Sequence, residues 1–138
     1  MAAVTSIMRA QQILLARVDE ELRPFELTLA RFELLMLLHF SREGALPMGT
    51  IGRRLQVHPT SVTSAVDRLE RQELVRREPH PTDRRTKLVS LTDAGRDRVL
   101  AAVEVLNGSV FADPGLPEGR TEELVALLGQ LRGRADGF

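Results

Sequence analysis

Hydrophobic residues recur at helical spacing through most of the chain. Between residues 4 and 22 they fall at i, i+3, i+4 and i+7, which predicts an amphipathic helix that ends before Pro24. Thr28 can cap a second helix over residues 29–40, whose composition leaves little polar surface, so this helix should be central and buried. Further helices are expected at about 49–56, at 60–72, from after Thr92 to about Phe111, and at 118–131.

The pattern changes in two places. The stretch "SREGALP" at 41–47 should break the second helix without forming an element of its own. Residues 75–78 and 87–91 alternate like antiparallel strands, with Val89 and Leu91 directed to the core and "PHPTDRR" as the tip of the hairpin. Such a hairpin after a helical pair is a wing.

The two helices before the hairpin have helix–turn–helix spacing. Ile51 and Leu55 should face inward from the first, Gly52 allows close approach of another helix, and residues 57–59 form a tight turn. On a helical wheel, the second helix buries the side that carries Val62, Ala65, Val66 and Leu69. The opposite side carries hydroxyl groups and then cations, from Thr60, Ser61, Ser64, Arg68 and Arg71.

A face of this kind fits a DNA major groove, which is ~12 Å wide. Hydroxyl groups could reach base edges or phosphates, and arginines could reach phosphates or guanine. Taken alone, the same helix is more typical of an ordinary amphipathic surface helix whose first serine and threonine serve as caps. The hairpin that follows directly favours the DNA interpretation.

Charge and composition narrow the choice of function. The chain of 138 residues has zero net charge, yet residues 53–87 carry nine Lys/Arg against five Asp/Glu, which is +4. This is a candidate footprint for a polyanion, although a mixed, solvated surface would have similar numbers. There is no cysteine, no apparent signal peptide and no stretch close to the ~20 apolar residues of a membrane span, so we expect a cytoplasmic protein without membrane contact.

The tip of the hairpin carries the most specific chemistry. Arg85 could enter the minor groove, which is only ~6 Å wide, while Arg84 and Lys87 lie near phosphates. Asp83 would repel phosphate, unless it orients Arg85 through a bidentate contact. Asp83 could also act as a turn former, and both roles could coexist.

No combination of residues indicates catalysis or a cofactor. The histidines are His39, His58 and His80, and neither a HExxH motif nor a phosphate-binding loop nor a nucleophile elbow occurs. His80 and Asp83 could ligate a metal but are more typical of a polar turn, since stable sites usually need three or four ligands. We interpret His58 as a cap or phosphate donor and His39 as a hydrogen-bonded core histidine. A winged helix that binds proteins instead of DNA stays an alternative.

Five short motifs occur in order along nearly the whole chain. They are Leu27-Thr28, "SVTSAVDRLE" at 61–70, "LVRR" at 74–77, "DRR" at 83–85 and "LTDAGR" at 91–96. Together they resemble the MarR family of winged helix–turn–helix transcriptional regulators. One departure is Glu73, where the family usually has a glycine, so the end of the helix over 60–72 is expected to differ.

The resemblance implies a mostly α fold with a small β-wing, in a single domain over residues 1–138. Residues 1–26 and 93–138 would be dimerisation helices of an obligate homodimer, and residues 27–92 the DNA-binding region. Helix 60–72 would contact the major groove of a pseudo-palindromic operator through the positions of Thr60, Ser61, Ser64 and Arg68. Wing 75–91 would contact the minor groove through Arg85, supported by Asp83.

The resemblance also implies regulation, as a repressor relieved by a small anionic or aromatic ligand between the dimer helices and the DNA-binding region. Arg31 and His39 are the polar candidates there, although core or surface roles suit both. Independently, the terminal segments are amphipathic, with faces that a monomer of this length would struggle to cover. The alternative is that these helices pack on their own core.

Overall fold

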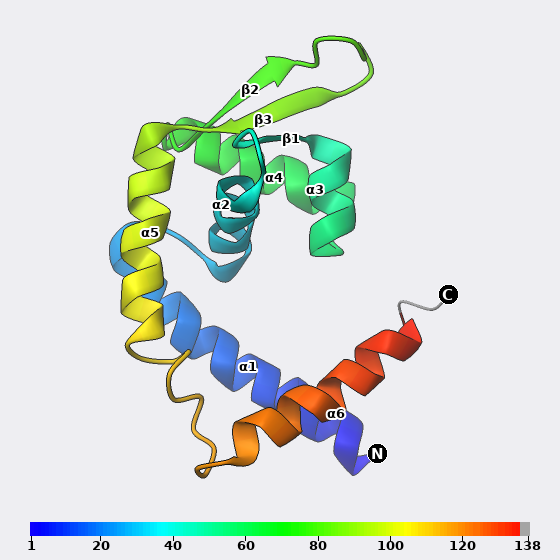
Figure 1. Ribbon diagram of the computed structural model, residues 1–138, viewed down its shortest axis with the longest axis vertical. Coiled ribbons are helices and arrows are strands. Elements are labelled where there is room, and N and C mark those ends of the chain that lie inside the picture. The colour runs from blue at the N-terminus through cyan, green and yellow to red at the C-terminus, as the bar shows by residue number, and fades with distance from the viewer. Residues whose placement is uncertain (136–138) are drawn as a thin grey trace.

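The computed structural model describes residues 1–135, which form a mostly helical protein with a small antiparallel sheet (Figure 1). In chain order the elements are α1 (Ala2–Leu22), η1 (Arg23–Phe25), α2 (Leu29–Phe40), β1 (Ala45–Pro47), α3 (Met48–Leu55), α4 (Pro59–Arg71), β2 (Val75–Pro79), β3 (Lys87–Leu91), α5 (Asp93–Asn107) and α6 (Arg120–Ala135). The predicted class, helical with a small β-wing, is therefore confirmed.

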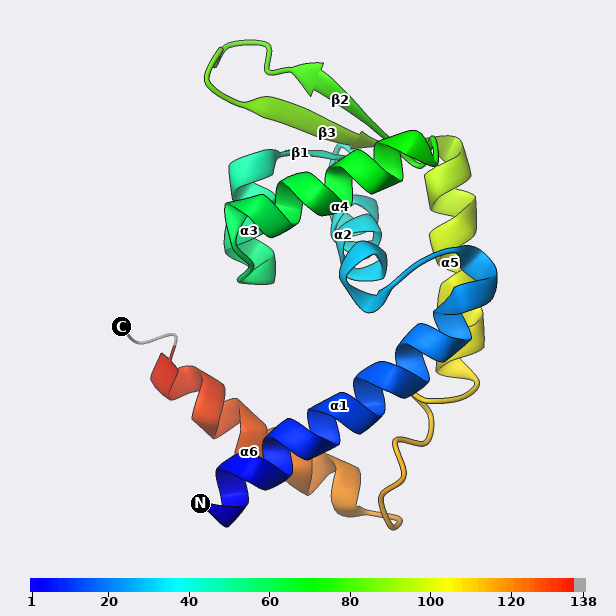
Figure 2. The same ribbon diagram turned by 180° about the vertical axis from the view of Figure 1, so that it is seen from behind.

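Helix α2 is the centre of the winged-helix half. The Thr28 side chain accepts a hydrogen bond from the backbone N–H of Arg31, as expected of its cap. Leu34, Leu35 and Leu38 are almost completely buried. Figures 1 and 2 show α3, α4 and α5 arranged around α2, which confirms the prediction of a central helix.

The sheet has the strand order β1-β3-β2. Strands β2 and β3 form the predicted hairpin, in which Val75 pairs with Leu91 and Pro79 with Lys87. Val89 is fully buried and Leu91 is half-buried against the core. Strand β1 was not predicted, because three residues that end in proline give no alternating pattern and are held in place by pairing with distant β3.

Helix α4 ends in a left-handed turn at Glu73, whose φ is 61°. The N–H of Glu73 donates to the Glu70 carbonyl and that of Leu74 donates to the Leu69 carbonyl, both at 3.0 Å. This is the Schellman arrangement that glycine usually occupies. The expectation that glutamate would change this helix end is therefore wrong. Glu73 adopts the left-handed conformation instead, and its backbone is strained because it is not glycine.

Helix α5 ends earlier than the sequence pattern indicated. Its last residue is Asn107, followed by Gly108, whereas the prediction extended it to about Phe111. The apolar spacing continues beyond the helix because Val110, just outside it, is buried in the core. The half-exposed Phe111 ring lies with its centroid 6.4 Å from that of Phe32. The N–H of Phe111 still donates to the Leu106 carbonyl, at 2.9 Å.

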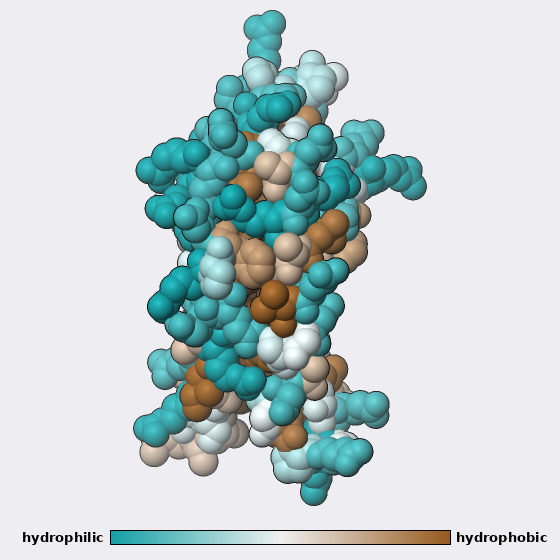
Figure 3. All heavy atoms as spheres, turned by 90° about the vertical axis from the view of Figure 1, so that its left-hand side faces the viewer, coloured by the Kyte–Doolittle hydropathy of each residue, from teal (hydrophilic) through white to brown (hydrophobic). Residues whose placement is uncertain are grey.

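The two terminal helices are only partly covered. In α1, Val18 and Leu22 are buried, whereas several apolar residues of its first half are exposed, namely Val4, Ile7, Met8 and Ile13. In α6 the exposed apolar residues are Leu124, Val125, Leu127 and Leu131. These helices form the part of the molecule farthest from the wing (Figure 1), and brown side chains lie among polar ones on the α5 side (Figure 3).

The alternative in which both terminal helices bury their apolar faces on the core of the same chain is therefore not observed for the described residues. Residues 136–138, the end of the C-terminal segment expected to dimerise, lie outside the described residues.

Candidate nucleic-acid interface

Helix α4 begins at a tight turn and presents a polar face. The His58 Nδ1 accepts the backbone N–H of Thr60 at 3.1 Å, so His58 is the cap of this helix, and Pro59 occupies its first turn. Val62, Val66 and Leu69 are buried and anchor the opposite side to α2 and α3. The predicted division of this helix into an apolar and a polar side is confirmed.

All eight residues predicted to contact DNA have exposed side chains. They fall into two groups, Thr60, Ser61, Ser64, Arg68 and Arg71 on α4, and Arg84, Arg85 and Lys87 on the wing. The five from α4 line one groove beside the start of α2. The wing group lies on the other side of α4, because Arg85 and Lys87 line a second groove with Val62 and Thr63.

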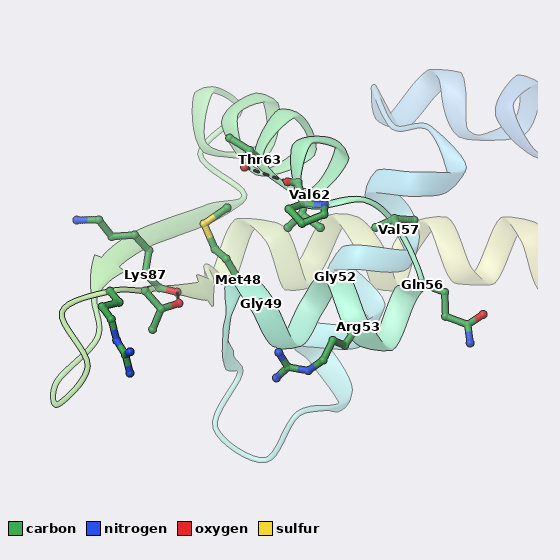
Figure 4. Close-up of a pocket in the computed structure, with 12 residues that line it drawn as sticks. Met48, Gly49, Gly52, Arg53, Gln56, Val57, Val62, Thr63 and Lys87 are labelled. Carbon is green, nitrogen blue, oxygen red and sulfur yellow. Dashed lines mark hydrogen bonds between the residues drawn. The ribbon is translucent and has the colours of Figure 1, made fainter. Parts of the chain in front are cut away.

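This second groove runs between α3, the start of α4 and the wing (Figure 4). Its volume is about 720 Å³, its floor includes Met48 and Gly52, and Arg53 lies on its rim with the two wing cations. A Cβ atom on Gly52 would lie 3.4 Å from the Val62 side chain, so the close helix approach predicted at this glycine is present. Arg53, which lies in the last turn of α3, was not among the predicted contacts.

The tip of the wing is a network of turn hydrogen bonds. The His80 Nδ1 accepts the N–H groups of Thr82 and Asp83, at 3.2 and 3.0 Å. The Asp83 Oδ1 accepts both the backbone N–H of Arg85, at 3.0 Å, and its Nε, at 3.3 Å. The carboxylate thus forms the turn and contacts the guanidinium at the same time.

The contact between Asp83 and Arg85 differs from the predicted bidentate pair, because a single carboxylate oxygen takes both N–H groups. The turn that brings Oδ1 to the backbone N–H two residues ahead also brings the same oxygen to Nε of that residue. These N–H groups hold the pKa of Asp83 below its usual value, the backbone bond most strongly. The aspartate is therefore charged at neutral pH, and its stabilising effect is lost only as pH falls through that lowered pKa.

The base of the wing is tied to α4 by Arg77, which the sequence analysis did not single out. Its Nη2 lies 2.5 Å from Asp67 Oδ1 and 3.1 Å from Glu70 Oε1, and its backbone N–H donates to Glu70 at 3.2 Å. The hydrogen bonds to Asp67 and then Glu70 raise the pKa of Arg77. Asp67 and Glu70 are three residues apart on one helix face, a spacing that could have indicated a shared cationic partner.

The two candidates for ligand binding are separated in the structure. Arg31 and His39 lie at opposite ends of α2, roughly 12 Å apart along the helix axis. The His39 ring lies tilted beside that of Phe40, with the centroids 5.4 Å apart. Its Nδ1 has no hydrogen-bond partner among the described residues, so the prediction of a hydrogen-bonded histidine is wrong. Arg31 instead lines the groove beside α4.

Within residues 1–135, no three His, Asp or Glu side chains are grouped to hold a metal ion. In the same residues, no helix combines the length and apolarity that crossing a bilayer requires.

Comparison with known proteins places this architecture. The MarR family model matches residues 27–87, which run from the cap of α2 into the start of β3. An HTH-type transcriptional regulator of Bacillus subtilis, YhbI, is 30% identical over 84% of this chain and 75% of its own length. The chain belongs to the MarR family.

Solved structures of MarR-family regulators extend the likeness to the whole chain. Sco5413 of Streptomyces coelicolor is 49% identical, with a TM-score of 0.92 over all of this chain and 96% of that one. Sco3205 of the same organism, solved in complex with DNA, is 26% identical, with a TM-score of 0.80 over 99% of this chain and 85% of that one. Each of these relatives is named a transcriptional regulator.

Proposed function

We propose that this MarR-family protein is a dimeric, sequence-specific regulator that binds double-stranded DNA. Helix α4 enters the major groove and the wing enters the minor groove. The observation that carries the proposal is the pairing of two exposed polar surfaces, the hydroxyl and arginine face of α4 and the cationic wing tip. The neutral chain concentrates its positive charge there because a duplex is a polyanion.

Within this proposal, the residues of α4 have two roles. Ser64 and Thr60 discriminate between bases, since hydroxyl groups near the start of an inserted helix reach base edges. Arg68 and Arg71 hold phosphates, because longer side chains extend from the groove to the backbone. Ser61 follows Thr60 in the first turn of α4 and contacts either base edges or phosphates.

On the wing, Arg85 is the residue that enters the minor groove. Its side chain is 91% exposed and has a single ionic partner, Asp83, among the described residues. A long arginine held in one orientation before binding loses less side-chain entropy, a cost of up to ~2 kcal/mol, when it inserts. Arg84 and Lys87 lie next to it and contact phosphates.

Dimerisation follows from the exposed apolar faces of α1 and α6. A contiguous apolar surface on a monomer marks an interaction site, and a second copy of the same chain offers the same surface in return. The dimerisation helices would be residues 1–26 and 93–138, and the DNA-binding region residues 27–92. A two-fold dimer would direct two α4 helices at half-sites about 34 Å apart, which implies a pseudo-palindromic operator.

Regulation would take place as repression in the cytoplasm, relieved by a small anionic or aromatic ligand. One relative of 38% identity, MdtR of Bacillus subtilis, is named a transcriptional repressor, and it matches 46% of this chain and 41% of its own length. A dimer bound across a promoter would exclude other proteins from the same duplex.

The experiment that tests the proposal is nuclease protection of intergenic DNA, followed by affinity measurements on variants of the protected site. Ser64→Ala should change the relative binding free energies of those site variants by about 1 to 3 kcal/mol for each base contact that is lost. Arg71→Ala should weaken all of them alike and lower the salt slope by about one. Binding that is insensitive to salt, or no duplex binding at all, would instead favour a module that binds proteins.

A further inference from the structure

One groove beside the polar face of α4 is lined in part by Arg31, which comes from α2 and not from the helix–turn–helix. It has a volume of about 530 Å³ and lies between the start of α2 and the polar face of α4. Residues of α4 form one wall, and Thr28 and Arg31 form the other. We propose that this groove seats a backbone phosphate of the bound duplex and that Arg31 contacts this phosphate together with Arg68.

Neither of these arginines is held in a direct ion pair by the described residues, although the Asp19 carboxylate acts on Arg31 through its charge. Arg31 and Arg68 form no ion pair with any carboxylate among the described residues, and the buried Nε of Arg31 has no hydrogen-bond partner there. One bond from Arg31 is present, a long one of 3.4 Å from its Nη2 to the Glu26 carbonyl. The guanidinium groups of Arg31 and Arg68 therefore line one groove with N–H donors that no described residue accepts.

Burial and then the charge of Arg68 lower the pKa of Arg31, while Asp19 raises it to a smaller extent. The arginine stays charged at neutral pH, but in an unfavourable environment that an anion would relieve. The Asp19 carboxylate is already engaged, since its Oδ1 accepts the N–H of Leu29 at 2.8 Å. The start of α2 itself is thus largely occupied, and the site depends on its side chains.

The position of the groove fits a duplex held by α4. Ser61, Ser64 and Arg68 line this groove, whereas Val62 and Thr63 line the groove on the wing side, so the two lie on opposite flanks of the helix. In Figure 2, α4 lies in front with the wing above it and the start of α2 below. The two strands that border a major groove would therefore meet the wing cations on one flank and Arg31 on the other.

The test compares Arg31→Gln with Arg42→Gln, a variant that removes the same charge at the exposed loop beyond the other end of α2. This inference rests on the proposed DNA binding. Arg31→Gln should weaken binding to the operator and to unrelated duplexes alike, by roughly three- to tenfold at physiological salt, and lower the salt slope by about one. Arg42→Gln should match the wild type in both measurements.

Unchanged affinity and slope in Arg31→Gln, with normal loss of affinity in Arg85→Ala, would overturn the phosphate seat and leave the proposed function intact. If Arg85→Ala and Arg68→Ala also had no effect, the proposed function itself would fail. If Arg31→Gln also lowers the melting temperature, Arg31→Lys distinguishes a phosphate contact from a structural role. Lysine keeps the charge, so a phosphate contact requires the salt slope of DNA affinity to return to the wild-type value, whereas a purely structural role does not. Inorganic phosphate could also stabilise the free wild-type protein. If Arg31→Gln abolished that stabilisation but kept the wild-type affinity for DNA, the groove would bind a free anion and the proposal would be overturned.

Discussion

The two ends of the wing hold arginine in opposite ways. At the base, the Arg77 side chain is 23% exposed and bonded to two carboxylates of α4. At the tip, the Arg85 side chain is 91% exposed and contacts one carboxylate of its own turn. An arginine whose donors are used within the fold is a structural link, whereas one whose donors are mostly free is available to a partner. The same residue type in one hairpin thus occurs in two environments, and the neighbouring carboxylates set how many of its donors stay free.

The largest effect should come from the site where the wing base meets α5. A Cβ atom on Gly95 would lie 2.1 Å from the Leu74 carbonyl oxygen and 2.9 Å from the Leu91 side chain. Because a backbone carbonyl cannot move aside cheaply, Gly95→Ala should destabilise the fold by about 3 kcal/mol or more, at the upper end of overpacking costs. Urea unfolding would measure this.

Gly129 is the matched control, since a Cβ atom there meets nothing within 4 Å among the described residues. Gly129→Ala should be neutral or stabilising by up to ~1 kcal/mol, as expected of a helical site with open space around the added Cβ atom. Equal stability of the two variants would mean that the wing base is not fixed at Gly95.

At the tip, the change should appear in DNA binding and not in folding. Arg85→Ala should reduce operator affinity by about 1 to 3 kcal/mol, at unchanged unfolding free energy. Asp83→Ala should also weaken binding although it removes a negative charge, because the screened repulsion between a solvated carboxylate and phosphate is small. Titrations of both single variants and the double variant would form a double-mutant cycle.

Within that cycle, the Asp83 effect should shrink once Arg85 is absent. Additive effects, or tighter binding by Asp83→Ala, would reduce the aspartate to a turn residue.

At the base, Arg77→Met should do the reverse of Arg85→Ala. It should lower the unfolding free energy by about 1 kcal/mol, a modest figure because Asp67 and Glu70 are 48% and 43% exposed and so partly screened. Methionine keeps most of the apolar stem, so the change isolates the ionic contacts. If Arg77→Met left stability unaltered but abolished DNA binding, Arg77 would belong with the tip arginines and the comparison would fail.

The smallest effect concerns the left-handed turn that leads into the wing. Glu73→Gly should stabilise the protein by about 0.5 to 1 kcal/mol, since glycine adopts a φ of 61° without strain. Thermal unfolding would detect the change, with Glu78→Gly, on an exposed strand residue, expected to have the opposite sign. A destabilised Glu73→Gly variant would mean that the glutamate side chain contributes more than its backbone costs.

Periodicity gave the helices and the hairpin because their signals are local. The caps at Thr28 and Thr92 could be predicted, since a hydroxyl group before an apolar run has a local reason to be there. Strand β1 could not be predicted, because it exists through pairing with residues 41 to 45 positions away in the chain. The end of α5 was misplaced because an apolar residue such as Val110 can be buried in the core from a turn.

For the candidate interface, the exposed face of α4 could be predicted from a helical wheel. Contacts between side chains of different elements could not. Arg77 could have bonded several nearby carboxylates, and its choice of Asp67 and Glu70 depends on how the wing returns over the helix. In the same way, the proximity of Arg31 to Arg68 requires the packing of α2 on α4, which no spacing along the chain encodes.

The strand order β1-β3-β2 leaves two sheet edges, and each is poorly suited to extension by another strand. Strand β1 has three residues and ends in Pro47, while β2 carries Arg76, Arg77 and Glu78 and ends in Pro79. Proline has no backbone N–H to donate, and charged side chains on an edge strand disfavour its pairing with the edge strand of another molecule. Polymerisation through intermolecular β-pairing is thereby discouraged, so the wing can project into solvent without becoming a nucleus for aggregation.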